Sequence, residues 1–370
     1  MQKTRQSIRS DLGVLLICVA TLILVGLIFI YSSSSVYALE RLGSAHYFVK
    51  RQLIGLLLGL IGLIIVRKTP LRLIKQWSPA FFFGSLILTA MTMIPFFAQR
   101  IHGSSRWLNL GGLVFQPSEL LRITFLIYLA YFLAKKEKST GSLAHSYLPF
   151  LIILGVTSVL LLKQPDFGMT VTLAMTGFIL LFIAQFKTKH LLITLSALLP
   201  VGIALVGLKP YRLQRILTFL NPWSDPLGSG FQIIQSLIAI GSGGLTGLGI
   251  SHSKQKFFYL PMLHTDFIFS IIAEETGFIG AFALITIFCI FLYFGLRLAW
   301  RLTDPFSMFT TLGFVIVTSL QAIINLAVTT GLVPTKGIGL PFVSYGNTSL
   351  ICNLCMLGLI INIVSTEQRN

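Results

Sequence analysis

Apolar runs long enough to cross a bilayer recur along the chain, separated by short polar or glycine- and proline-rich segments. A helix needs about 20 predominantly apolar residues to span the hydrocarbon core, so each run predicts one transmembrane helix. The ten runs lie near residues 12–31, 48–66, 79–99, 119–134, 147–162, 169–186, 190–208, 266–296, 307–331 and 343–364. The pattern therefore predicts an all-α polytopic membrane protein with about ten transmembrane helices.

The charges between the runs predict the orientation of these helices. Ten spans place both termini on one side, and the short segments on that side carry most of the Lys and Arg found between runs. Short basic loops face the cytoplasm, so both termini are expected there. The chain is then a single membrane domain, residues 1–370, with one large extracytoplasmic loop at about 209–265 between the seventh and eighth helices.

Within that loop, the segment 230–240 has the periodicity of an amphipathic helix. Phe231, Ile234 and Ile238 share one face, and Gln232, Gln235 and Ala239 lie on another. This pattern is typical of a helix that lies at the membrane surface.

Composition agrees with a membrane protein and excludes a soluble globular one. The chain is 55% hydrophobic and 11% charged, against about 45–50% and about 25% in soluble domains. A net charge of +17 can indicate nucleic-acid binding, but in a polytopic membrane chain it more often indicates membrane topology or an anionic lipid-linked ligand, and no nucleic acid is expected as a partner. No Walker A or GxGxxG sequence supports nucleotide binding, and the four cysteines lie in apolar runs, which excludes a disulfide scaffold.

Acidic residues at the rim of a span are candidates for chemistry, because an ionisable group is costly there. Asp266 stands where the basic outer loop enters the eighth span, two residues after His264. Two interpretations remain open, a helix N-cap or a general base at the outer face. Further along the span, Glu274 and Glu275 point in different directions, so at least one is expected to pair with a neighbouring helix. Gly277 would allow close packing there.

A second group of charges surrounds the start of the fourth span. Glu119 and Arg122 are three residues apart on one helical face, which predicts an ion pair. Arg106 lies in a Gly/Ser-rich turn with no evident partner and is a candidate for binding phosphate. The Gly- and Pro-rich segment 332–349 interrupts structure at membrane depth, which is tolerated where backbone lines a wet cavity. Basic outer segments thus converge around few carboxylates, as expected for an anionic lipid headgroup site.

These motifs, in this order, resemble the SEDS family (shape, elongation, division and sporulation) over nearly the whole chain. The Tyr31–Ser35, Asn221–Gly230 and Pro334–Gly337 segments are more similar to its division branch, FtsW, than to its elongation branch, RodA. The other segments that carry the resemblance are Gly103–Trp107, Gln116–Glu119, Gln164–Asp166, Tyr259–Phe269, Glu274–Gly277 and Ile338–Gly346.

The resemblance implies a peptidoglycan glycosyltransferase that polymerises lipid II. The GlcNAc 4-hydroxyl of the acceptor attacks the MurNAc anomeric carbon, and undecaprenyl pyrophosphate leaves. Asp266 matches the family's catalytic aspartate, the base, and Arg106, Glu119 and Arg122 match residues of its cavity. A leaving pyrophosphate requires positive charge, which adds further candidates. The remaining expected substrate-binding residues are Arg212, Arg215, His264, Lys336 and Ser344.

The resemblance also implies partners and a location. A class B penicillin-binding protein, the transpeptidase, is the expected partner, together with other membrane proteins of division at the septum of the bacterial inner membrane. A divalent cation, Mg²⁺ or Mn²⁺, would suit the pyrophosphate, but no ligand cluster in the sequence identifies one. Three alternatives remain: a lipid II flippase, an elongation-type polymerase, and a catalytically silent scaffold.

Overall fold

The structure is a computed structural model of the chain. It describes residues 2–101, 104–110, 113–136, 142–207, 210–256, 264–335 and 337–369. In this part of the chain a helix occupies each of the ten predicted runs. These helices are α1 (Gln2–Leu42), α2 (Tyr47–Lys68), α3 (Leu71–Met91), α4 (Pro117–Lys136), α5 (Leu148–Lys163), α6 (Phe167–Ile183), α7 (Thr188–Gly207), α10 (Ile268–Trp300), α11 (Pro305–Thr329) and α12 (Asn347–Arg369).

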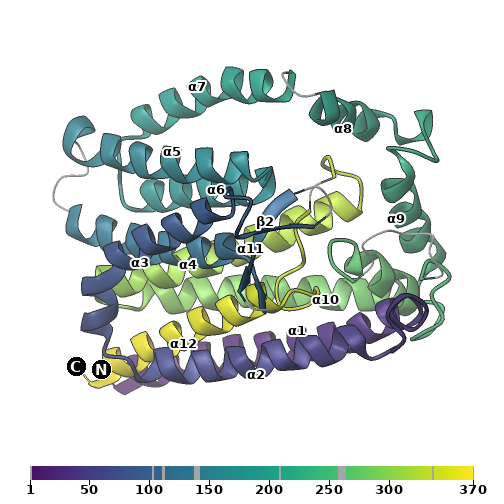
Figure 1. Ribbon diagram of the computed structural model, residues 1–370. Coiled ribbons are helices and arrows are strands. Elements are labelled where there is room, and N and C mark those ends of the chain that lie inside the picture. The colour runs from purple at the N-terminus through teal and green to yellow at the C-terminus, as the bar shows by residue number, and fades with distance from the viewer. Residues whose placement is uncertain are drawn as a thin grey trace.

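Seven helical segments of the described chain are long and apolar enough to cross a membrane, and α3, α6 and α7 fill the other three predicted positions. The predicted helical, polytopic fold is therefore confirmed. The two ends of the chain lie together at one end of the molecule (Figure 1), as an even number of crossings requires. The orientation of that end towards the cytoplasm stays a prediction.

The helices pack side by side, with α4 and α11 enclosed by the others (Figure 1). Helix α11 contacts α4, α6, α10 and α12, and α12 packs along α2. Accordingly, α4 and α11 have most of their residues buried, whereas α2 turns most of its apolar side chains outward. The enclosed helices can hold polar side chains away from lipid.

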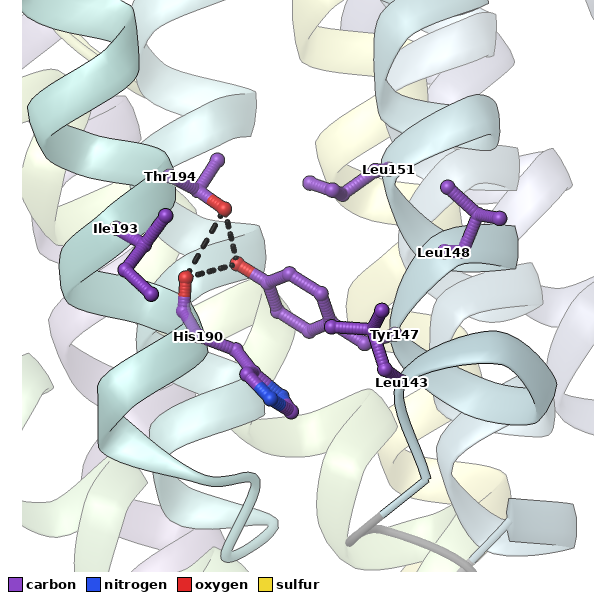
Figure 2. A pocket seen from close by; sticks show the side chains of 7 residues that line it. All are labelled: Leu143, Tyr147, Leu148, Leu151, His190, Ile193 and Thr194. Atoms are coloured by element: carbon purple, nitrogen blue, oxygen red, sulfur yellow. Dashed lines mark hydrogen bonds between the residues drawn. The ribbon is translucent and has the colours of Figure 1, made fainter.

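Helix α7 lies at the edge of the bundle, and most of its apolar side chains are exposed. At its start, the Tyr147 hydroxyl of the π-helical turn η2 (Leu143–Tyr147) is 3.0 Å from the His190 carbonyl oxygen and 2.7 Å from the Thr194 hydroxyl. Around this contact is a pocket of about 180 Å³ (Figure 2), lined mostly by leucine and isoleucine. The lining residues include no carboxylate and no arginine, so this pocket is not the expected headgroup site.

A small antiparallel sheet follows α3, and the pattern of apolar runs did not predict it. Its strands β1 (Ala98–Ile101), β2 (Ser104–Leu110) and β3 (Leu113–Phe115) pair in that order. The third run predicted a span over 79–99, but α3 ends at Met91 and Pro95 follows in a turn. Proline lacks the backbone N–H that would continue a helix. The sheet places Arg106, on β2, beside the helices.

The predicted amphipathic helix exists, but only part of its predicted apolar face is buried, together with residues outside that face. Two helices occupy the long loop, α8 (Pro210–Leu220) and α9 (Phe231–Ser242). In α9, Ile233, Ile234, Ser236 and Ala239 are buried, whereas Ile238 is 44% exposed. Ser236 lies 2.6 Å from the Ser270 hydroxyl and donates to the Thr329 carbonyl, also at 2.6 Å. Contacts with α10 and α11 therefore decide which face of α9 is covered.

Candidate active site

Asp266 lies in the turn that leads into α10. The N-cap of α10 is Phe267, and no side chain caps the helix, so the N-cap interpretation of Asp266 was wrong. The backbone carbonyl of Asp266 accepts a hydrogen bond of 2.7 Å from the Asn325 amide. Its carboxylate oxygen Oδ2 lies 3.2 Å from the point that a Cβ on Gly337 would occupy. The carboxylate thus faces the loop between α11 and α12, with no side chain in between.

The surroundings of Asp266 set its proton affinity. Poor solvation raises the pKa of its carboxyl from 3.8 to about 6, while the positive charges of Arg106 and Arg215 lower it and Asp166 raises it. Poor solvation therefore raises the pKa of Asp266 by more than the two nearby arginines lower it. A carboxyl with a pKa near 6 is ionised at neutral pH and still binds a proton well enough to act as a general base.

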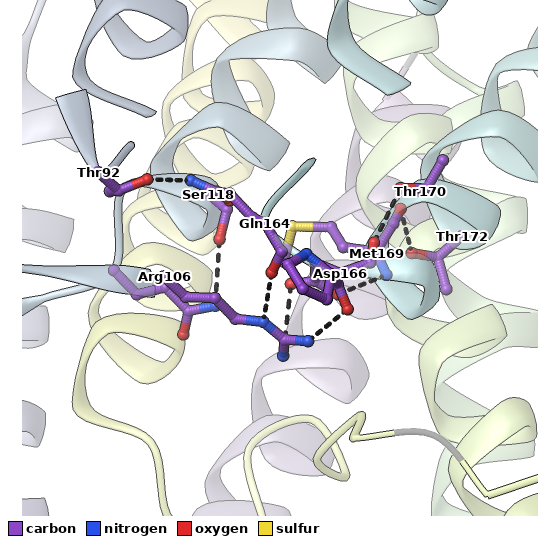
Figure 3. Close-up of polar contacts among 10 residues, drawn as sticks. Thr92, Arg106, Ser118, Gln164, Asp166, Met169, Thr170 and Thr172 are labelled. Atoms are coloured by element: carbon purple, nitrogen blue, oxygen red, sulfur yellow. Dashed lines mark hydrogen bonds and ion pairs between the residues drawn. The ribbon is translucent and has the colours of Figure 1, made fainter. Parts of the chain in front are cut away.

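Arg106 is anchored to the turn between α5 and α6 (Figure 3). Its Nε donates to the Gln164 carbonyl at 3.0 Å and its Nη2 to the Pro165 carbonyl at 2.6 Å. Its Nη1 lies 3.9 Å from Asp166 Oδ2, and Asp166 caps α6 by accepting from the Met169 amide. The expectation that Arg106 lacks a partner was therefore wrong. Because its side chain stays 21% exposed, its free N–H groups can reach a ligand.

The predicted ion pair between Glu119 and Arg122 is confirmed. Glu119 Oε2 and Arg122 Nη2 are 3.0 Å apart, and both side chains are buried. Arg122 also donates to Gln321 at 2.5 Å and to Asn353 at 2.7 Å. These contacts hold Arg122 inside the bundle, where its charge is compensated by Glu119.

Two of the other expected substrate-binding residues, Arg215 and Ser344, make contacts with the loop or the turn of Asp266. Arg215 of α8 donates to the Thr335 carbonyl at 3.0 Å, which brings it to the loop that faces Asp266. The Ser344 hydroxyl donates to the Thr265 carbonyl at 2.5 Å and accepts from the Leu340 amide, so it joins the loop to the turn of Asp266. The side chain of Arg212 and the whole of Lys336 lie outside the described residues.

His264 is held among aromatic rings. Its ring centroid is 4.2 Å from that of Phe48, 5.7 Å from Tyr345 and 6.3 Å from Tyr37. Burial lowers the pKa of His264 to about 4, so its imidazole is neutral at physiological pH. It therefore cannot supply positive charge to a pyrophosphate, although a neutral ring can still form hydrogen bonds.

Comparisons with known proteins agree with the motifs. The FtsW/RodA/SpoVE family model, described as "Cell cycle protein", matches residues 13–369. The chain belongs to this family. The relative named "Probable peptidoglycan glycosyltransferase FtsW" from Trichlorobacter lovleyi is 42% identical over 95% of this chain and 92% of its own length. "Stage V sporulation protein E" of Bacillus subtilis is 38% identical over 94% and 96%. The chain is thus shown to be a SEDS protein.

Solved structures of the family have the same architecture. A chain described under "Structural coordination of polymerization and crosslinking by a peptidoglycan synthase complex" matches with a TM-score of 0.80 and 31% identity, over 96% of this chain and 98% of its own. The RodA structure from Thermus thermophilus matches with a TM-score of 0.70 and 26% identity, over 96% and 97%.

Glu274 and Glu275 of this SEDS chain have structural partners. Glu275 accepts a hydrogen bond of 2.6 Å from Ser32 of α1, which confirms the predicted pairing with a neighbouring helix. Glu274 accepts from Ser253 and from the Lys254 amide at 2.9 Å. Gly277 adopts φ 67°, and a Cβ there would lie 2.3 Å from the Gly247 nitrogen. The close packing at Gly277 is therefore with the glycine-rich loop after α9.

No group of three potential His, Cys, Asp or Glu ligands occurs in the described part of the chain. Arg106 and Arg215 are the charges that act on Asp266 together with Asp166. A carboxylate that shares its surroundings with two guanidinium groups does not fit a site for Mg²⁺ or Mn²⁺, which prefer several oxygen ligands. The divalent cation expected from the chemistry therefore has no evident ligand set among the described residues and stays a prediction.

The sequence interpretation missed the buried amides Gln321, Asn325 and Asn353. Each lies in an apolar helix and contacts the site or the Arg122 ion pair. The signal was available, because an amide side chain inside a spanning run is costly unless it has partners.

Proposed function

We propose that this chain is a peptidoglycan glycosyltransferase that polymerises glycan strands from lipid II during cell division. The observation that carries the proposal is the setting of Asp266, a poorly solvated carboxylate with pKa about 6 near two arginines and a loop of glycine backbone. The enzyme class follows from near full-length relatives named peptidoglycan glycosyltransferase FtsW, at 39–42% identity. The division branch is supported by the name FtsW that these relatives carry.

In the reaction, Asp266 takes the proton of the GlcNAc 4-hydroxyl of lipid II. The hydroxyl oxygen forms a bond to the MurNAc anomeric carbon of the growing strand as the bond to pyrophosphate breaks. The electron pair leaves with undecaprenyl pyrophosphate, and the anomeric configuration inverts. Arg106 uses two of its N–H groups on carbonyls and Arg215 uses one, so both keep donors for the developing negative charge.

The location of the site suits a lipid-linked substrate. The turn of Asp266 precedes α10 at the end of the bundle opposite the chain termini (Figure 1). With the termini in the cytoplasm, that end faces the outer leaflet at the septum. A class B penicillin-binding protein would then receive the strands for crosslinking, a partnership supported by the similarity to a peptidoglycan synthase complex. Other division proteins of the membrane are further expected partners.

The test is polymerisation of lipid II by the purified protein with its cognate transpeptidase. Asp266→Asn keeps the size of the side chain but removes the base, so we expect the rate to fall by about 10²–10⁴-fold. Asp304→Asn is the matched control, because Asp304 caps α11 through the Ser307 amide at 3.0 Å and asparagine caps as well. Equal polymer from wild type and Asp266→Asn would refute the base role, whereas no polymer from the wild type would refute the polymerase and favour a flippase or a scaffold.

A further inference from the structure

Two amide side chains on one face of α11 bind the same loop. Gln321 and Asn325 are four residues apart, which places them one turn above each other. Asn325 is fully buried and Gln321 is 9% exposed. Gln321 Nε2 donates to the Gly339 carbonyl at 3.2 Å, and Asn325 Nδ2 donates to the Ile338 carbonyl at 2.7 Å. The pair therefore holds the backbone of residues 338–339.

Each amide also forms a hydrogen bond with one charged residue, Asn325 with the backbone of Asp266 and Gln321 with the side chain of Arg122. Asn325 Nδ2 donates to the Asp266 carbonyl as well, again at 2.7 Å. Gln321 Oε1 accepts from Arg122 Nη1, and Arg122 is ion-paired with Glu119. Hydrogen bonds thus connect the turn of Asp266 to Ile338 and the buried ion pair to Gly339, and the backbone between these two adjacent residues joins the two sets.

The contacts determine the orientation of the Asn325 amide. A rotation by 180° would place Oδ1 against two carbonyl oxygens, so the nitrogen must face the Asp266 and Ile338 carbonyls. In this orientation Oδ1 is buried and has no hydrogen-bond partner in the described chain. An unpaired buried acceptor costs stability, and an apolar side chain of similar size would avoid that cost. The asparagine at this position is therefore explained by the two hydrogen bonds that its nitrogen donates, to the carbonyls of Asp266 and Ile338.

Asn325 joins the turn that carries the reacting Asp266 carboxylate to the loop that this carboxylate faces. The Asp266 carboxylate faces Gly337, the residue next to Ile338. The Tyr345 amide donates to the His264 carbonyl at 2.8 Å, and Ser344 donates to the Thr265 carbonyl, so turn and loop are bound along their length. Among the described side chains whose contacts are given above, Asn325 donates to both the turn and the loop, at the centre of their contact. Its removal would let the two segments separate where the carboxylate lies.

We infer that Asn325 and Gln321 are positioning residues of glycosyl transfer: Asn325 fixes the Asp266 carboxylate relative to the 337–339 loop, and Gln321 fixes that loop relative to the Arg122–Glu119 pair. The inference rests on the proposed function, because it assumes that Asp266 reacts. Neither amide touches the substrate in this scheme.

The test compares Asn325→Leu and Gln321→Met, which remove the donors at similar volume, with Thr318→Val. Thr318 lies on the same helix, is 1% exposed, and its hydroxyl has no hydrogen-bond partner in the described chain. A misplacement of about 1 Å costs on the order of 10²-fold in rate, so we expect kcat to fall about 10–100-fold in Asn325→Leu and less in Gln321→Met. KM for lipid II should change little, and Asn325→Ser, which keeps one donor, should retain an intermediate kcat.

The pH–rate profile separates positioning from a loss of folded protein. Separation of turn and loop admits water to Asp266, so the acidic limb of Asn325→Leu should move below the wild-type value near pH 6. A lower kcat with an unmoved limb, or an equal loss in Thr318→Val, would overturn the inference and leave a structural role. Wild-type kinetics in Asn325→Leu alongside an inactive Asp266→Asn would overturn it without touching the proposed function. Activity in Asp266→Asn would overturn the base role on which the inference rests, and no polymer from the wild type would overturn the proposed function itself.

Discussion

Gly337 allows the sharpest perturbation of the site, because a single methyl group added there meets the carboxylate. The ideal Cβ of an alanine would lie 3.2 Å from Asp266 Oδ2, closer than an ordinary van der Waals contact. Either the loop or the carboxylate must therefore move by a few tenths of an ångström. If about 1 Å of misplacement costs on the order of 10²-fold, this shift lowers kcat by about 3–10-fold.

The same methyl group changes the electrostatics of Asp266 in a defined direction. It displaces solvent from an already poorly solvated carboxylate, which raises the pKa of Asp266 above its present value of about 6. The general base must be deprotonated, so the rate increases as the pH rises through this pKa. We therefore expect the acidic limb of Gly337→Ala to move to higher pH, opposite to the shift expected for Asn325→Leu.

The assay is the initial rate of lipid II polymerisation between pH 5 and 8, with glycan products separated by length. Gly346→Ala is the control from the same loop, since its added Cβ would lie 3.7 Å from the Ser349 Cβ, an ordinary contact. A Gly337→Ala enzyme with the wild-type rate and an unmoved acidic limb would show that Asp266 does not react from the position described here.

Two further predictions concern stability and topology. Arg122→Met leaves Glu119 buried without its cation and should destabilise the fold by about 3–5 kcal/mol, measured as a lower midpoint of thermal unfolding in detergent; an unchanged midpoint would contradict the buried ion pair. Leu227, 90% exposed in the long loop, should react as Leu227→Cys with an impermeant thiol reagent in intact spheroplasts. Labelling only after lysis would reverse the proposed orientation.

Local pattern alone predicted the helices and the contacts within them. Apolar runs of spanning length specify transmembrane helices because a bilayer leaves unpaired backbone groups no alternative partner. The Glu119–Arg122 pair was equally predictable, since residues three apart on a helix are neighbours in any tertiary context. Asp266 stood out as a rare carboxylate at the rim of a span.

Tertiary structure decided what depends on residues far apart in the chain. Arg106 donates hydrogen bonds to the carbonyls of Gln164 and Pro165, which lie 58 and 59 residues later in the chain. These carbonyls belong to a turn whose position no local pattern specifies. The buried face of α9 was chosen by α10 and α11, because several faces of that helix are apolar enough to be covered. The environment of Asp266 likewise came from other elements: the Asn325 amide, the Gly337 backbone and the arginines of β2 and α8. Solvation and charge at an atom are sums over neighbours in space, and only the folded chain determines which neighbours those are.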